Sequence, residues 1–437
     1  MQDDGTRGPA RTASGFTLFL SGLAAFSAYF AMYAFRKPFA VATYADVAGW
    51  QFAIDYKSAL LIAQVIGYAL SKLIGVRVIS EAGRQGRART ILGLIGASWA
   101  ALVLFALVPA PWNVACLFFN GLPLGLIWGL VFSYVEGRRV SELLGAMLCA
   151  SFILSSGVVK SVAVLLMDAG VAEQWMPAAT GLAFAPVLLT ALWQLERLPP
   201  PDARDEAERT ARVPMQAADR AAFLRAHGAT LVLLVLGYVL LTALRDIRDN
   251  FARELWTALG YGGEAAVFSA SELPIALLTL AALALLMLIR DNLRALLAMH
   301  GLILLGALCL GGSTLAFQAG LLAPLPWMTV AGAGLYLAYT PFNAMLFDRM
   351  IATIGTAANA GFLIYIADAS GYVGSVTLML VHALGAPEVR WLPFFITCCY
   401  AAALAVGGLT LVSALHFLRT GTERRLIHRP ASPTTSA

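Results

Sequence analysis

The sequence predicts an all-α membrane protein with twelve transmembrane helices, arranged as two pseudo-symmetric six-helix bundles. Three observations lead to this fold class: the composition, the number of apolar segments, and the alternation of basic loops. Of the 437 residues, 59% are hydrophobic and only 13% are charged, and the mean hydropathy is +0.76. Because a soluble globular domain has about 25% charged residues, a lipid bilayer is the expected solvent.

Twelve apolar segments can be marked along the chain, each near the roughly 20 residues that a helix needs to cross a bilayer. They lie at about residues 15–43, 57–80, 90–109, 112–136, 142–167 and 176–195, and then at 229–252, 265–289, 294–316, 325–348, 356–384 and 392–417. The interval between the two sets contains three consecutive prolines and six arginines, which is typical of a polar linker. We therefore expect bundles at 15–195 and 228–418, joined by a linker at 196–227.

Arginines set the expected orientation, because positively charged short loops stay on the cytoplasmic side of a membrane. They gather in alternate connections: before the first segment, after the second, after the fourth, in the linker and in the tail. The opposite loops carry acids such as Asp55, Asp168 and Glu173 instead. This pattern predicts that the N-terminus (1–14) and the tail (419–437) are both cytoplasmic, with the protein in the cell inner membrane.

Cysteine, histidine and charge usage argue against several other classes of protein. The five cysteines all lie within apolar segments without a CxxC spacing, and no histidine has a second ligand at metal spacing. The sequence therefore predicts no cofactor, no metal site and, without a nucleophile–base pair, no enzyme. The net charge of +5 is mostly arginine without interleaved aromatics, which suits lipid headgroups rather than nucleic acid. We expect a monomer whose partners are a small anionic solute and the bilayer.

An Arg36-Lys37 pair lies inside the first apolar segment, where each charge costs about 2.5 to 3.5 kcal/mol on insertion scales. Tyr29, Tyr33 and Arg36 are spaced at i, i+4 and i+7 and so share one face of a helix. Both cations could extend to the outer headgroups as anchors, or they could face a cavity and contact an anion. We expect Arg36, with Tyr29 and Tyr33 on its face, to contact substrate, and Lys37 to be an anchor.

Two lysines lie within later segments. Lys72 follows Gln64 and Tyr68 at four-residue spacing, and this polar stripe indicates a wet cavity. Lys160 lies one or two turns beyond a pair of serines on the fifth segment. Each lysine could instead extend its ammonium group to a membrane surface. Both interpretations stay open, with Lys72, Tyr68 and Lys160 as candidate substrate-binding residues.

A short internal repeat gives Arg36 a counterpart. Residues 29–36 follow the pattern Tyr-x-x-x-Tyr-Ala-Phe-Arg, and residues 238–245 follow Tyr-x-x-x-Thr-Ala-Leu-Arg, which places Arg245 at the same offset. Arg245 could pair with Asp249 one turn later and form a neutral structural bridge. Alternatively, its planar guanidinium could bind phosphate or carboxylate opposite Arg36, at the interface of the two bundles.

Acidic residues within the segments are fewer. Glu272 precedes a proline on the eighth segment, and Asp368 lies well inside the eleventh. Together with Asp249, these carboxyl groups are candidates for neutralising a cavity cation or for binding a proton that is coupled to transport. For Asp368, a role in local helix packing is the alternative.

Several stretches resemble the organophosphate:inorganic phosphate antiporters of the major facilitator superfamily, which include glycerol-3-phosphate and hexose-phosphate transporters. Residues 29–40 (YFAMYAFRKPFA) resemble that family's first-helix signature, in which an Arg-Lys pair follows aromatic residues. Residues 67–75 (GYALSKLIG) are similar to its second helix, and residues 339–341 and 361–374 to its tenth and eleventh. The similarity extends over most of the chain but is weak, and only the stretches in the first two helices are specific to that family.

The resemblance implies the major facilitator fold and phosphate binding by Arg36 and Arg245. It also implies that Lys72 is a basic cavity residue and that Glu272 is an acidic residue of the second half. The chain departs from the family at the fifth-helix histidine, where residues 152–156 read FILSS, and in the loop after the second helix. Asp368 is a further residue that departs from the family pattern. The substrate and the exchange mechanism can therefore differ from those of the family.

The resulting hypothesis is a secondary active transporter of a small anionic solute, phosphate or a phosphorylated compound, that works by alternating access. The resemblance favours antiport. Two alternative functions remain. One is a carrier-fold membrane sensor that binds its ligand and signals without turnover, and the other is a proton-coupled transporter of a non-phosphorylated organic anion.

Overall fold

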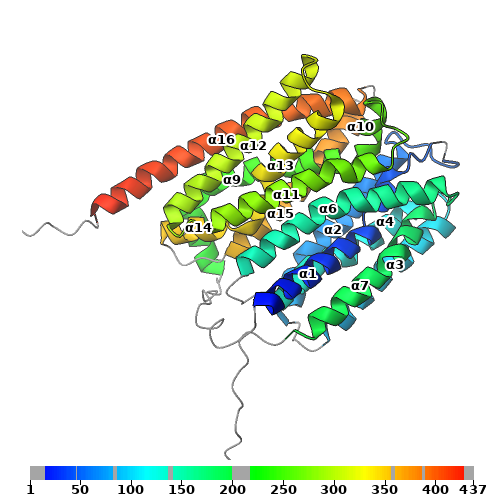
Figure 1. The fold of residues 1–437 in the computed structure, drawn as a ribbon, viewed down its shortest axis with the longest axis horizontal. Helices are drawn as coiled ribbons and strands as arrows, with labels where there is room; N and C mark the ends of the chain where they lie inside the picture. Colours follow the sequence, from blue (N-terminus) through cyan, green and yellow to red (C-terminus); the bar gives the residue numbers. More distant parts are fainter. Residues whose placement is uncertain are drawn as a thin grey trace, which may run out of the picture.

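A computed structural model describes residues 15–45, 47–81, 86–135, 141–198, 217–355, 360–385 and 389–427, and within these ranges every regular element is a helix. The first set of helices is α1 (Gly15–Met32), α2 (Tyr56–Glu81), α3 (Arg87–Leu107), α4 (Asn113–Leu124), α5 (Ile127–Val135), α6 (Ser141–Asp168) and α7 (Met176–Glu196). The second set is α9 (Ala217–Asn250), α10 (Ala252–Ala258), α11 (Ala266–Met287), α12 (Asn292–Gln318), α13 (Pro324–Ala344), α14 (Leu346–Ile354), α15 (Ala360–Leu380) and α16 (Trp391–Ile427). The long helices lie side by side as a bundle (Figure 1).

Within the described residues, all twelve predicted apolar segments fall on helices. The fourth segment is divided between α4 and α5, and the tenth between α13 and α14. Nine of the described helices are long and apolar enough to cross a membrane, and a shorter apolar helix covers Phe19–Tyr33. Hydropathy alone therefore located the elements, because a segment that must satisfy its backbone hydrogen bonds within a bilayer has to be helical. The expected N-terminus and most of the expected linker lie outside the described residues.

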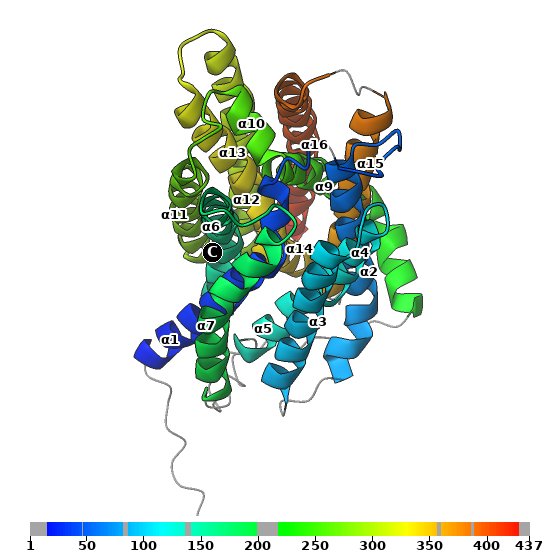
Figure 2. The ribbon, with the colours of Figure 1, turned by 90° about the vertical axis from the view of Figure 1, so that its right-hand side faces the viewer.

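Helices of each set pack mainly against members of their own set. In the first set α1 lies against α7 and α6, and α2 lies against α4; in the second, α12 contacts α13 and α16, and α9 contacts α15 and α16. The two sets meet most extensively where α6 contacts α11, and they also meet where α2 contacts α15, where α6 contacts α13 and where α10 contacts residues 38–41. Figures 1 and 2 show both sets in side and end views, and in Figure 1 α1 begins at the same end of the bundle where α16 ends.

The first segment is not one continuous α-helix. The sequence predicted a span over residues 15–43, but α1 ends at Met32 and is followed by two 3-10 turns, Tyr33–Phe35 and Pro38–Val41. Proline has no backbone N–H and clashes with the preceding turn, so Pro38 interrupts the helix here. Arg36 and Lys37 lie between the two turns.

Candidate functional site

A small central cavity lies between the two sets of helices. Its volume is about 10 Å³, which is roughly the space of one water molecule, so side chains nearly fill it. The lining is unusually rich in charge for a membrane interior. The central cavity is lined by Tyr33, Arg36, Lys37, Phe152, Ser156, Arg245, Asp246, Asp249 and Tyr336.

Arg36 is a buried cation of the central cavity and is only 4% exposed. Its guanidinium carbon lies 3.7 Å from the ring centroid of Tyr68 and 5.9 Å from that of Tyr33. Its Nε has no hydrogen-bond partner, and in the described parts of the chain no carboxylate pairs with it. Because a buried charge without a counter-ion is costly, the arrangement around Arg36 suits an incoming anion.

Lys37 also faces the interior and is 4% exposed, so the expectation that it anchors at the headgroups is wrong. Its Nζ donates to Oδ1 of Asn250 at 2.7 Å and forms an ion pair with Asp249. Consecutive residues of an α-helix point about 100° apart, which would have turned Lys37 away from the face of Arg36. The interruption after Met32 removes that constraint, and both cations line the same cavity.

Asp249 is the carboxylate that joins the two sets of helices at the cavity. It pairs with Lys37 and with Lys160, and it accepts a hydrogen bond from the hydroxyl of Ser156. Lys160 is buried, so it does not extend to the membrane surface. The alternative in which Asp249 pairs with Arg245 along α9 is also wrong, because Asp249 pairs with Lys37 and with Lys160 of α6 instead.

Arg245 lines the central cavity together with Arg36, but its charge is partly neutralised. Its Nη2 pairs with Oδ1 of Asp246 at 2.8 Å, and its Nη1 donates to the hydroxyl of Tyr339. The second oxygen of Asp246 accepts from Ser375 at 2.7 Å. The two arginines that the repeat had paired therefore share one cavity, and only Arg36 lacks a carboxylate partner within the described ranges.

Lys72 and Asp368 form an ion pair between α2 and α15, with Nζ and Oδ2 3.0 Å apart. Asp368 also accepts a hydrogen bond from Tyr238, whose hydroxyl lies 2.9 Å from that of Tyr339. The interpretation in which Lys72 extends its ammonium group to the membrane surface is therefore wrong. Asp368 is the salt-bridge partner of Lys72. Neither residue lines the central cavity, and neither does Tyr29, whose ring meets that of Tyr33 edge-on.

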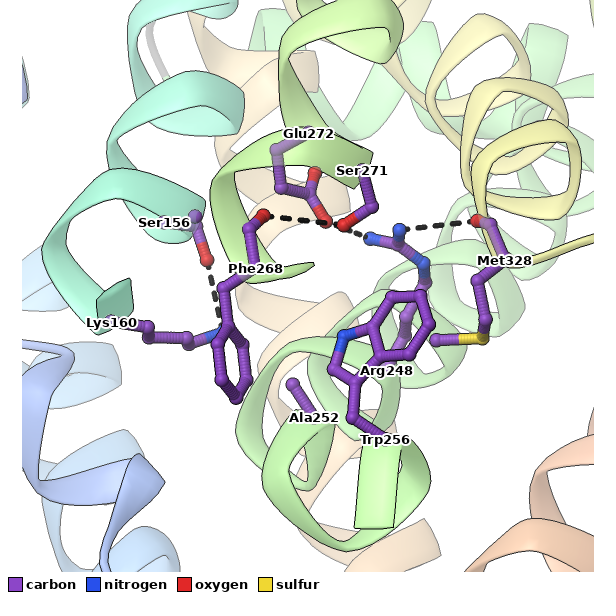
Figure 3. A pocket seen from close by; sticks show the side chains of 10 residues that line it. Ser156, Lys160, Arg248, Ala252, Trp256, Phe268, Ser271, Glu272 and Met328 are labelled. Atoms are coloured by element: carbon purple, nitrogen blue, oxygen red, sulfur yellow. Dashed lines mark hydrogen bonds and ion pairs between the residues drawn. The ribbon is translucent and has the colours of Figure 1, made fainter. Parts of the chain in front are cut away.

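A second cavity of about 10 Å³ lies beside the first, between α6, α9, α10, α11 and α13 (Figure 3). Arg248 crosses it to pair with Oε1 of Glu272 at 2.6 Å, while Oε2 of Glu272 has no hydrogen-bond partner. Figure 3 shows Lys160 and Glu272 on facing helices of this cavity. Here α6 approaches α11 closely, since a Cβ on Gly157 would lie 2.4 Å from the carbonyl oxygen of Phe268.

Two side chains of this region were not selected from the sequence: Asn250 and Tyr339. For Asn250 the charge-dense run over residues 245–250 was the available signal, because few helices place so many polar groups within two turns inside a membrane. The partners of both residues lie on other segments of the chain and could not be read from spacing. Across the described ranges, no group of three His, Cys, Asp or Glu side chains is placed to hold a metal ion.

Comparison with solved structures defines the fold, which the chain shares with a solved symporter and with a solved homologue of peptide transporters. The chain superposes on the crystal structure of a D-xylose-proton symporter with a TM-score of 0.58 at 15% identity, covering 92% of this chain and 97% of that chain. A bacterial homologue of the human drug peptide transporters PepT1 and PepT2 gives 0.58 at 14% identity, covering 93% and 99%. At this identity the likeness shows the fold alone.

The sequence family is also defined. A family model described as "Family of unknown function (DUF5690)" matches residues 38–420, and the chain therefore belongs to that family. A comparison with curated protein sequences found no match. The fold and the nine apolar helices among the described residues make this a multi-pass membrane protein.

Proposed function

We propose that the protein is a secondary active transporter of a small anion, phosphate or a phosphorylated compound, that works by alternating access. One observation carries the proposal: Arg36 is a buried cation without a carboxylate partner in the described ranges, and it lines the same cavity as Arg245. Two planar guanidinium groups can bind phosphate oxygens through paired N–H donors. The resemblance of the first two helices to the organophosphate antiporters supports the same substrate class.

The charge around the two cavities fits an anion with two negative charges. Five cations and three carboxylates line them, which leaves an excess of two positive charges. A phosphate monoester carries about −1.5 to −2 at pH 7, so it would neutralise this excess. The cations are Arg36, Lys37, Lys160, Arg245 and Arg248, and the carboxylates are Asp246, Asp249 and Glu272.

An anion bound at Arg36 would be coupled to the movement of the two sets of helices. Lys37 and Lys160 belong to the first set, and their shared partner Asp249 belongs to the second. A phosphate between the arginines would compete with Asp249 for these lysines and weaken the contact that holds the sets together. In this scheme Lys37, Lys160 and Tyr33 contact the anion, Tyr68 orients Arg36, and the bundles 15–195 and 228–418 rock about the site.

A second candidate is proton-coupled transport of a non-phosphorylated organic anion. Asp368 favours it, because this carboxylate connects Lys72 of α2 with Tyr238 of α9. Protonation of Asp368 would remove its charge and weaken the contact between α2 and α15. Glu272, with one oxygen unpartnered in the second cavity, is a further carboxyl of this kind. We place both termini on the cytoplasmic side of an inner membrane, following the alternation of basic loops.

Counterflow in proteoliposomes tests the proposal. We expect vesicles loaded with unlabelled phosphate or glycerol phosphate to accumulate labelled phosphate, and Arg36→Ala and Arg245→Ala each to reduce accumulation to the level of protein-free liposomes. Arg225→Ala is the matched control, because Arg225 lies on α9 like Arg245 but is exposed. Full counterflow by both cavity variants would contradict the proposal. Saturable phosphate binding without counterflow would support a sensor, and counterflow only of carboxylates under a proton gradient would support the second candidate.

A further inference from the structure

We propose that Gln64 and Asn120 are positioning residues of the anion site. They hold the interrupted end of the first segment so that Arg36 and Lys37 both face the central cavity. This inference rests on the proposed function, because it assigns Gln64 and Asn120 a role in anion binding. Neither residue lines the cavity, and neither is expected to touch the substrate.

The interruption leaves two backbone carbonyls without their usual partners. In a continuous α-helix, the carbonyls of Phe35 and Arg36 would accept from the N–H groups four residues later. The N–H of Ala40 donates instead to the carbonyl of Lys37 at 3.1 Å. A buried carbonyl without a hydrogen bond is costly in a membrane, where no water is present to replace the partner.

Two side-chain amides supply these missing hydrogen bonds. Nδ2 of Asn120 donates to the carbonyl of Phe35 at 3.0 Å, and Nε2 of Gln64 donates to the carbonyl of Arg36 at 2.8 Å. Nε2 of Gln64 also donates to Oδ1 of Asn120 at 2.7 Å, so the two amides form one unit. Asn120 is 0% exposed and Gln64 is 3% exposed, so these contacts are shielded from solvent.

The packing of α2 against α4 fixes these two amides relative to each other. A Cβ on Gly121 would lie 2.2 Å from the carbonyl oxygen of Gln64, and a Cβ on Gly67 would lie 2.2 Å from that of Phe118. Only glycine allows the two backbones to approach so closely. Nδ2 of Asn120 also donates to Oγ of Ser98 at 2.7 Å, which links the pair to α3.

The same helix that holds the backbone of Arg36 also holds its side chain. Tyr68 lies one turn after Gln64 on α2, and its ring stacks on the guanidinium of Arg36. Gln64 and Tyr68 therefore fix Arg36 at both ends, through its carbonyl and through its charged group. Loss of the amide contacts should release the segment that carries both cations, rather than lower stability evenly across the bundle.

Two substitutions remove the amide donors at nearly constant size: Asn120→Leu and Gln64→Met. Asn113→Leu is the matched control, because Asn113 lies on α4 and is also buried, but within the described residues no hydrogen bond joins its side chain to residues 33–42. Hydrogen–deuterium exchange of the full chain in nanodiscs gives a local readout, and the affinity for inorganic phosphate gives a functional one. We expect faster exchange over residues 33–42 and about tenfold weaker phosphate binding in the two test variants, with neither change in the control.

Unchanged exchange over residues 33–42 in a folded Gln64→Met variant would overturn the positioning role, whatever happens to affinity. Gln64→Met alone decides the question if Asn120→Leu does not fold. If the wild-type protein binds no phosphate but the local exchange still rises, the proposed substrate is wrong and the structural role of the two amides is supported. If exchange rises and affinity is unchanged, the amides are structural only and the inference fails.

Discussion

The guanidinium of Arg36 stacks on the ring of Tyr68, with the guanidinium carbon 3.7 Å from the ring centroid. The two residues come from different helical segments, and both are almost fully buried. A cation above an aromatic face is stabilised by the ring quadrupole without losing its positive charge. Arg36 thus stays charged and oriented in the bundle interior while its hydrogen-bond donors remain available to an anion.

Replacing Tyr68 should weaken anion binding through Arg36. A desolvated cation–π contact is worth about 2 kcal/mol, so we expect Tyr68→Leu to reduce phosphate affinity by about 30-fold. Tyr68→Phe retains the aromatic face and is the control, with affinity close to that of the wild type. Titration calorimetry of the purified protein measures both. Equal losses in the two variants would show that the hydroxyl group, and not the ring, supports Arg36.

Asp249→Asn should destabilise the protein most strongly when no anion is present. This change leaves Lys37 and Lys160 buried without their shared carboxylate, and breaking a buried ion pair costs about 3 to 5 kcal/mol. Added phosphate should restore more thermal stability to the variant than to the wild type, because it supplies the missing negative charge. Thermal melting in detergent, with and without phosphate, provides the measurement.

The control for that experiment is Glu254→Gln, which removes the carboxylate that pairs with Lys57 outside the two cavities. The side chain of Lys57 is 5% exposed and that of Glu254 is 25% exposed, so this change also leaves a buried lysine without its carboxylate. Neither residue lines the two cavities, so we expect a loss of stability that phosphate does not reverse. An equal response of both variants to phosphate would rule out a specific competition between the anion and Asp249.

Lys72 and Asp368 should behave as an energetically coupled pair. Lys72→Met and Asp368→Leu each leave one charge unpaired, and we expect each to lower the free energy of unfolding by about 1 to 3 kcal/mol, the cost of an unsatisfied buried group. The double variant should lose less than the sum of the two single losses, because no unpaired charge remains. Denaturant titration in mixed micelles measures the cycle. Strictly additive losses would mean that the observed contact contributes no coupling.

Much of the fold was predictable because hydropathy is a property of each segment by itself. All twelve apolar segments coincide with helices, although α1 is shorter than its segment. The candidate site was predictable only in part. Arg36 was found because it is a charge inside an apolar segment, and Arg245 because a repeat placed it at the same offset; the structure shows both in one cavity. The roles of Lys37 and Lys160 were not, because each depends on Asp249, which is far away in the sequence.

The sequence by itself determined that this chain enters a membrane as a helical bundle, and that cations lie inside it. Apolar length and the cost of burying a charge are local quantities, so they can be read along the chain. Only the tertiary structure decided which charges are neutralised. That outcome depends on the rotation of each helix and on the interruption at Pro38, which turns Arg36 and Lys37 toward one cavity. Arg36 is left without a carboxylate partner among the described residues, because Asp246 is paired with Arg245 and Asp249 with the two lysines.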